Sequence, residues 1–208
     1  MNERCNQCWI GGNFDQSTRK NLAIFFEGPQ GSGKSTLSRL TASSIGIETR
    51  RGFPSGEDIK QANTQAEICK NSFESVNNTN KDSLIIFDRS PISQVAYMVK
   101  TEGKQYVNCT RDIVHRLQSA YFDKLIFFFL DAPSDICFSR QDMNSICSLR
   151  DILGYESERK AYKQIRDYMQ NELDKNGITI FSLDSSVKQE INQRKILKKL
   201  KFINSTNV

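Results

Sequence analysis

Short apolar runs alternate with segments of helical spacing along the chain. Five runs are strand candidates, at residues 22–27, 45–49, 83–88, 125–130 and 177–183. The run from Leu125 to Leu130 is uninterrupted, which is typical of a strand buried on both faces of a parallel sheet. Strands that alternate with helices and are joined by right-handed crossovers predict an α/β fold with a doubly wound parallel sheet.

The segments between these runs predict helices at 57–76, 91–101, 110–121 and 133–139. A polar connector at about 140–153 leads to a longer amphipathic helix, which places Tyr162, Ile165, Met169 and Leu173 on one face. Residues 1–20 are polar and irregular and predict a loose N-terminal extension. We therefore expect a single domain over 21–208, with a lid near 140–153.

The first strand candidate runs into the sequence Gly-Pro-Gln-Gly-Ser-Gly-Lys-Ser-Thr at residues 28–36. A strand, G-x-x-x-x-G-K-[ST] and a helix in this order predict a phosphate-binding P-loop. Glycines let backbone N–H groups turn inward around a polyphosphate, and the helix N-terminus adds further donors. Lys34 is expected to reach the β- and γ-phosphates, and the Ser35 hydroxyl to hold Mg²⁺. The predicted ATP-binding residues are Gly28, Gly31, Ser32, Gly33, Lys34, Ser35 and Thr36.

A carboxylate, Asp88, ends the apolar run at 83–88. At the carboxyl end of a strand beside a P-loop, it can bind Mg²⁺ through water or accept a proton from an attacking hydroxyl. The simpler interpretation is that Asp88 caps the next helix, a role that Ser90 could equally fill. Arg89 follows directly and offers a bidentate donor for phosphate, which favours the functional interpretation.

Three blocks of the sequence resemble the thymidylate kinase and deoxynucleoside kinase families, which are related P-loop phosphotransferases. The blocks are residues 26–36, Asp88-Arg-Ser90 followed by Ser93-x-x-Ala96-Tyr97, and residues 129–140. The resemblance spans about residues 22–183 and implies a five-stranded parallel sheet. It also implies transfer of the γ-phosphate of ATP, with Mg²⁺, to a nucleoside monophosphate, as in thymidylate kinases, or to a deoxynucleoside.

The same resemblance implies roles for individual residues. Arg89 would hold the phosphate of the acceptor or orient its sugar, and Phe53 and Tyr97 could line the acceptor pocket. Phe53 is equally well explained as an ordinary core or loop residue. Arg140 and Arg150 would belong to the mobile lid over the ATP phosphates. Because the P-loop itself contains no arginine, we assign Arg140 and Arg150, with Lys34 and Asp88, to catalysis.

The chain departs from the family pattern at two positions near the expected acceptor. Gln30 stands in the P-loop where thymidylate kinases usually carry an acidic residue, and Met98 stands where they often have glutamine. The base of the acceptor and its phosphorylation state are therefore left open.

A second enzymatic hypothesis places the acceptor hydroxyl on a modified base in DNA. It draws on the basic residues near the end of the chain, which are Lys188, Arg194, Lys195, Lys198, Lys199 and Lys201. Their spacing favours an amphipathic terminal helix with a solvated basic face. A non-catalytic nucleotide switch is disfavoured because Asp88 is followed by Arg-Ser-Pro and not by the x-x-Gly of a switch motif.

Length and composition fit these expectations. The chain has 208 residues, a net charge of +5 and no apolar run near the roughly 20 residues of a membrane span. We expect a cytoplasmic enzyme that acts on a small nucleotide, without a membrane, and that could form a homodimer. Cys5 and Cys8 have metal-ligand spacing, but no second pair follows to complete a tetrahedral site.

Overall fold

The computed structural model describes residues 20–54, 65–77, 84–140, 149–174 and 177–205. Its centre is a sheet of five parallel strands in the order β2-β3-β1-β4-β5. The strands are β1 (Lys20–Glu27), β2 (Thr49–Arg51), β3 (Leu84–Asp88), β4 (Phe122–Asp131) and β5 (Ile178–Asp184). The predicted fold class is confirmed.

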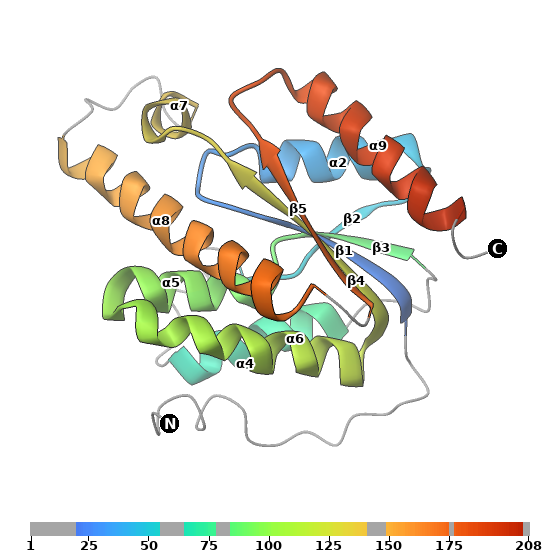
Figure 1. Ribbon diagram of the computed structural model, residues 1–208, viewed down its shortest axis with the longest axis horizontal. Coiled ribbons are helices and arrows are strands. Elements are labelled where there is room, and N and C mark those ends of the chain that lie inside the picture. Colours follow the sequence, from blue (N-terminus) through green and yellow to red (C-terminus); the bar gives the residue numbers. More distant parts are fainter. Residues whose placement is uncertain (1–19, 55–64, 78–83, 141–148, 175–176, 206–208) are drawn as a thin grey trace.

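Helices cover both faces of the sheet (Figure 1). One face carries α2 (Lys34–Ser44) and α9 (Gln189–Ser205). The other carries α4 (Gln65–Asn77), α5 (Ile92–Glu102), α6 (Cys109–Ala120) and α8 (Leu149–Glu172). The 3-10 helix η2 (Lys104–Asn108) joins α5 to α6, and the short α7 (Ser134–Ser139) follows β4.

The two faces divide the side chains of β1 between two apolar clusters. Ile24 and Phe26 pack with residues of α2 and α9, whereas Ala23 and Phe25 pack with residues of α4, α5, α6 and α8. The ring of Phe25 stacks on Phe87 and on Phe127 of the neighbouring strands, with 5.0 Å between centroids in each pair. Side chains alternate along a strand, so the next residue of this series, Glu27, faces the side of α5 and α8.

The second strand lies later in the sequence than predicted. The apolar residues Ile45 and Ile47 belong to the C-terminal cap of α2, because the N–H groups of both donate to the carbonyl of Ala42. Gly46 supplies the positive φ of 74° that this cap needs. The strand therefore begins only at Thr49, at the edge of the sheet beside β3. Apolar content alone could not separate a helix cap from a short edge strand.

The long amphipathic helix is confirmed, with Tyr162, Ile165 and Met169 buried on one face. It begins at Leu149, earlier than the polar composition of 140–153 suggested. The N-terminal extension was predicted over 1–20, but Lys20 already begins β1. Residues 1–19 and the central part of the expected lid, 141–148, lie outside the described residues. Among the helices that the structure describes, none combines the length and apolar character needed to cross a membrane.

Candidate active site

The predicted ATP-binding residues lie in the loop between β1 and α2 and in the first turn of α2. Gly31 and Gly33 have φ of 75° and 89°, a conformation that glycine adopts without strain. A Cβ atom at Gly31 would collide with the backbone carbonyl of Cys137, so the loop lies tightly against the end of α7. Helix α2 begins directly after Gly33 and has no side-chain hydrogen bond at its N-cap. The N–H groups of its first turn have no intrahelical partners and can bind an anion.

Lys34, the first residue of α2, is folded back over this loop. Its side chain is 4% exposed, and Nζ donates to the carbonyl oxygen of Pro29 at 2.6 Å and to Oγ of Ser32 at 3.4 Å. Burial and, second to it, the positive charge of Arg89 lower the pKa of Lys34 to about 7. A polyphosphate bound here would bring negative charge close to Nζ and so favour the charged form of Lys34.

Two carboxylates lie at the carboxyl ends of β1 and β3, and the one on β3, Asp88, is partly buried. Glu27 is fully buried, and Ser93 Oγ donates to its Oε2 at 3.0 Å. Burial raises the pKa of Glu27 to about 7. Within the described parts of the chain, Oε1 of Glu27 and Oδ1 of Asp88 have no hydrogen-bond partner. The sequence analysis identified Asp88 but missed Glu27, although both end an apolar strand with a carboxylate.

Arg89 has the only positive φ, 70°, among the described residues other than glycine. Its backbone N–H donates to the carbonyl of Phe26 at 3.1 Å, and the N–H of Gly52 donates to the carbonyl of Asp88 at 3.3 Å. A Cβ atom at Gly52 would collide with the carbonyl oxygen of Arg89. Contacts from β1 and from the end of β2 therefore hold a strained backbone, as is frequent at functional positions.

The guanidinium of Arg89 lies among acidic and phenolic groups. Burial lowers its pKa, but Tyr162, Glu158, Glu27 and Asp88 together raise it above the ordinary value. Arg89 Nη1 donates to the hydroxyl of Tyr162 at 3.4 Å. Arg89 is therefore a permanent cation near the ammonium group of Lys34.

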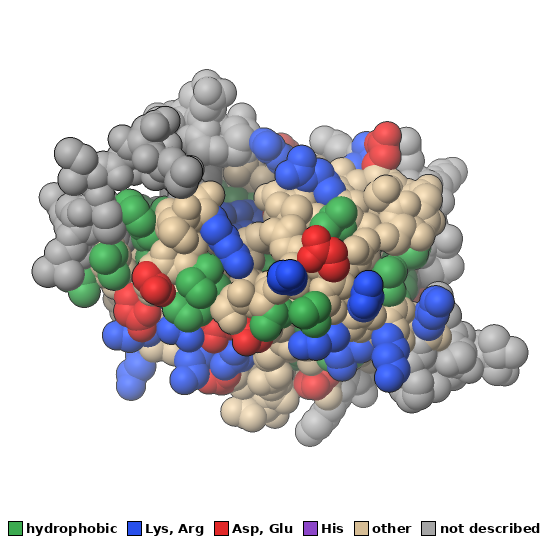
Figure 2. Space-filling view, turned by 90° about the horizontal axis from the view of Figure 1, so that it is seen from above, with side chains coloured by type: hydrophobic (Ala, Val, Ile, Leu, Met, Phe, Trp, Pro, Cys, Tyr) green, Lys and Arg blue, Asp and Glu red, His purple; other side chains and the backbone are tan. Residues whose placement is uncertain are grey.

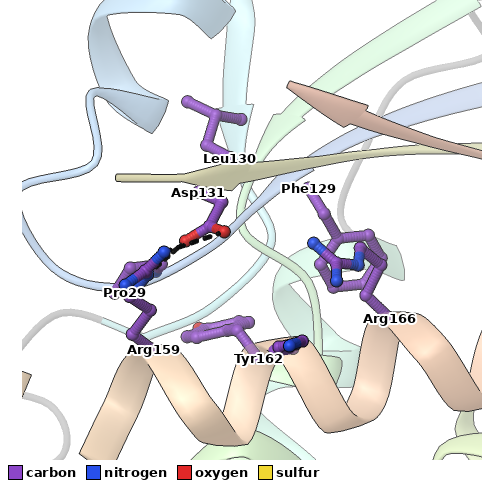
Figure 3. Close-up of a pocket in the computed structure, with 8 residues that line it drawn as sticks. Pro29, Phe129, Leu130, Asp131, Arg159, Tyr162 and Arg166 are labelled. Atoms are coloured by element: carbon purple, nitrogen blue, oxygen red, sulfur yellow. Dashed lines mark hydrogen bonds and ion pairs between the residues drawn. The ribbon is translucent and has the colours of Figure 1, made fainter. Parts of the chain in front are cut away.

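Helix α8 contributes side chains that the sequence analysis did not assign to the site. Oε1 of Glu158 accepts a hydrogen bond from the backbone N–H of Gln30 at 3.1 Å. Arg159 Nε donates to Oδ1 of Asp131 at 2.6 Å, and these two side chains point toward one another between β4 and α8 in Figure 3. Tyr162 lies beside them in the same pocket. The helical spacing predicted a buried face for α8, but only the packing of α8 against the P-loop shows which polar residues reach the site.

The remaining predicted residues are more spread out. Arg140 follows α7, and its Nη2 donates to the carbonyl of Ser185 at 2.8 Å, in the turn after β5. Arg150 lies in the first turn of α8, and its side chain is outside the described part of the structure. Phe53 is buried after β2, whereas Tyr97 on α5 is half exposed. Their assignment to the acceptor pocket stays a prediction, as do the catalytic roles of the two arginines.

The arrangement fits a magnesium ion that is held largely by phosphates. The partnerless Oδ1 of Asp88 provides an acceptor for a metal-bound water, and Ser35 stands in the first turn of α2 beside the loop. No group of three His, Cys, Asp or Glu side chains within the described ranges could form a dedicated metal cage. Mg²⁺ bound by few protein ligands together with substrate phosphates matches this donor set.

The burial of Glu27 predicts a pH dependence of stability. The folded protein holds the Glu27 proton more firmly than the unfolded chain, because the pKa rises from 4.5 to about 7. The contribution is complete below pH 4.5 and is lost as the pH rises to 7, by up to roughly 3 kcal/mol of unfolding free energy. We expect Glu27→Gln to remove this fall. Chemical denaturation of both proteins at pH 5 and pH 7 measures it; equal pH slopes would contradict the assignment.

Comparison with solved structures places this fold among known proteins. Deoxyadenosine kinase from M. mycoides with bound dATP is similar, with a TM-score of 0.58, 21% identity, and coverage of 87% of this chain and 99% of that chain. The structure of the same enzyme with its products dCMP and a flexible dCDP has a TM-score of 0.60 and 20% identity, and the match covers 87% of this chain and 99% of that chain. The YorR protein of Bacillus subtilis, in complex with phosphorylated GDP, has a TM-score of 0.59 and 18% identity, and the match covers 88% of this chain and 98% of that chain.

The chain has the P-loop kinase fold. The similarity extends over nearly the whole of the matched kinase chains, so it concerns the complete fold of this domain. A scan against protein-family models gave no match, and a search of curated proteins gave none either. Identities of 18–21% show that the fold is shared, whereas the activity has to be argued from the site itself.

Proposed function

We propose that this protein is an ATP- and Mg²⁺-dependent phosphotransferase that moves the γ-phosphate to a (deoxy)nucleoside monophosphate. The carrying observation is the pair of cations at one edge of the sheet, Lys34 inside the P-loop and Arg89 at the end of β3, with Asp88 beside them. A phosphate donor and a phosphate-bearing acceptor each need a cation, and the transferred group must pass between them.

The donor side rests on residues 28–36. The N–H groups of the loop and of the first turn of α2 would bind the β- and γ-phosphates, together with Lys34. Ser35 and Asp88 would hold Mg²⁺, which supplies charge neutralisation on the phosphates when bound. Arg140 and Arg150, which flank the connector between α7 and α8, would add positive charge as the transferred group leaves.

The acceptor side rests on Arg89. The strand next to β3 also ends in arginines, Arg50 and Arg51, and Arg51 is in register with Asp88. A cationic edge of this kind favours an acceptor that carries a phosphate. In the reaction an oxygen of the acceptor phosphate attacks the γ-phosphorus, the bond to the bridging oxygen breaks and ADP leaves. No proton has to be removed from such an acceptor.

A deoxynucleoside is the second candidate acceptor. The similarity to deoxyadenosine kinase favours it, and Glu27 and Asp88 lie close enough to Arg89 to influence its charge. In this version Arg89 orients the sugar and Asp88 accepts the proton of the attacking hydroxyl. The rest of the chemistry is unchanged.

A polymer acceptor has less support. In Figure 2, Lys and Arg side chains predominate on the side of α9, and they mix with acidic ones on the side of α8. The opposite face of α9 is buried through Ile196 and Leu200. This pattern is the amphipathic terminal helix with a solvated basic face that the sequence predicted. Transfer to DNA and a homodimer therefore stay predictions.

The test is an ATP-to-ADP assay with Mg²⁺ across nucleosides, nucleoside monophosphates and plain or modified DNA, with Lys34→Ala as the blank. We expect ADP formation that one monophosphate stimulates and that EDTA abolishes. Stimulation by an unphosphorylated nucleoside alone would move the function to the second candidate. No transfer to any small acceptor, with or without transfer to DNA, would refute both.

A further inference from the structure

A continuous chain of hydrogen bonds lies on the α5 and α8 side of the sheet, behind the P-loop. Arg89 Nη1 donates to Tyr162 Oη at 3.4 Å, Tyr162 Oη donates to Ser93 Oγ at 3.0 Å, and Ser93 Oγ donates to Glu27 Oε2 at 3.0 Å. The four residues come from β1, α5, α8 and the turn after β3. Glu27, Ser93 and Tyr162 are all at most 5% exposed.

The direction of these bonds is fixed by chemistry. When Glu27 is ionised, its carboxylate only accepts and a guanidinium only donates, so the two hydroxyl groups between them each donate toward Glu27 and accept from the side of Arg89. A buried hydroxyl group that lost its hydrogen-bond partner would be left unsatisfied, which costs free energy of folding. The hydrogen of Tyr162 is thus committed to Ser93, and its oxygen presents its lone pairs to Arg89.

Arg89 needs such a partner because its backbone fixes only part of its geometry. The positive φ places the start of the side chain, but several rotatable bonds lie between Cα and the guanidinium. A contact at Nη1 from a ring that is held by α8 restricts the end of the side chain as well. Tyr162 on α8 is held in turn by Ser93 on α5 and by Glu27 on β1, so three elements other than the turn that carries Arg89 contribute to this restriction.

We propose that Tyr162 is a positioning residue that sets the orientation of the Arg89 guanidinium toward the acceptor, with Ser93 and Glu27 as its anchor. The proposal rests on the proposed function, in which Arg89 binds the acceptor. Its consequence is selective: loosening Arg89 weakens acceptor binding, while ATP keeps its loop, its helix N-terminus and Lys34. A merely structural role for Tyr162 would instead affect both substrates through the fold.

The first test is steady-state kinetics of Tyr162→Phe, which keeps the buried ring and removes only the hydroxyl. The KM for the acceptor is expected to rise about tenfold, as for the loss of one hydrogen bond to a charged group, with the KM for ATP within about twofold. Tyr168→Phe is the matched control. Tyr168 lies on the same helix, half-buried against the core, and its variant is expected to behave as wild type.

Variants further along the chain of bonds test the anchor. Ser93→Ala is expected to raise the acceptor KM to the same extent, and the double variant with Tyr162→Phe no further, because both remove one connected unit. Multiplicative effects in the double variant would overturn the proposal.

A second measurement does not depend on finding the acceptor. Nitrogen NMR of the arginine guanidinium groups, with Arg89→Lys to identify the signal, reports rotation about the bond from Cζ to Nη1. We expect restricted rotation in wild type and in Tyr168→Phe, and averaged signals in Tyr162→Phe and Ser93→Ala. If wild type transfers phosphate to nothing, the proposed function fails and this signal still decides the positioning. Unchanged Arg89 signals in Tyr162→Phe, or an unchanged acceptor KM in an active enzyme, overturn the proposal.

Discussion

Lys34→Met is expected to lower kcat/KM for phosphoryl transfer by about 10³-fold, because it removes the cation that we propose binds the transferred phosphate. The same change is expected to leave the fold intact. Lys34 is buried with a pKa near 7, so methionine fills the space of its stem without a charge to desolvate. Activity by ADP formation and stability by thermal unfolding at pH 7 measure the two effects on one sample.

The pH dependence of stability sharpens this test. The pKa of Lys34 is lower in the folded protein than its ordinary value of 10.5, so wild-type stability is expected to rise from pH 7 upward, because the unfolded chain keeps the proton to higher pH. Lys34→Met lacks that rise. Lys100→Met, at an exposed position of α5, is the control and should keep both activity and the rise. Near-normal turnover in Lys34→Met would show that the P-loop lysine does not take part in phosphoryl transfer.

Arg150→Ala is expected to lower kcat by about 10³-fold while the affinity for ATP changes far less. The P-loop of this chain contains no arginine, so we expect the charge that develops on the transferred group to need a cation from outside the loop. Arg150 stands in the first turn of α8, the helix that also contacts the loop through Glu158. Rapid-quench measurement of the chemical step, with ATP binding measured separately, gives the two quantities.

Arg140→Ala is the informative comparison for Arg150→Ala. Because Arg140 donates to the carbonyl of Ser185, its loss is expected to loosen the turn after β5 and to raise the KM for ATP as well as to slow transfer. Arg111→Ala removes an exposed arginine paired with Glu172 and should change neither parameter. Wild-type kcat in Arg150→Ala would end its assignment to catalysis.

The local features of the site followed from the sequence because they depend on neighbours along the chain. A strand, a glycine-rich turn and a helix start lie within residues 20–44, so the P-loop could be recognised from spacing alone. Asp88 and Arg89 could be placed at the same edge because parallel strands end together. The uninterrupted apolar run at 125–130 predicted a strand in the interior of the sheet, and β4 lies between β1 and β5.

Other features depend on which elements meet in space. Ile45 and Ile47 predicted a strand but form a helix cap, because their N–H groups reach the carbonyl of Ala42. Arg89 has a left-handed backbone and its carbonyl lies against Gly52, a contact between the ends of β2 and β3. Neither the helix cap at Ile45 and Ile47 nor the left-handed backbone of Arg89 could be predicted from the propensities of the residues in one segment.

The sequence by itself determined the class of fold, the phosphate loop and the identity of its lysine, because repeating periods and a contiguous motif encode them. Only the tertiary structure decided the surroundings of Arg89. Glu27, Ser93 and Tyr162 are 66 and 69 residues apart along the chain, yet they form consecutive hydrogen bonds. Such a network exists only once β1, α5 and α8 are packed together, since burial both brings the groups into contact and makes their pairing necessary.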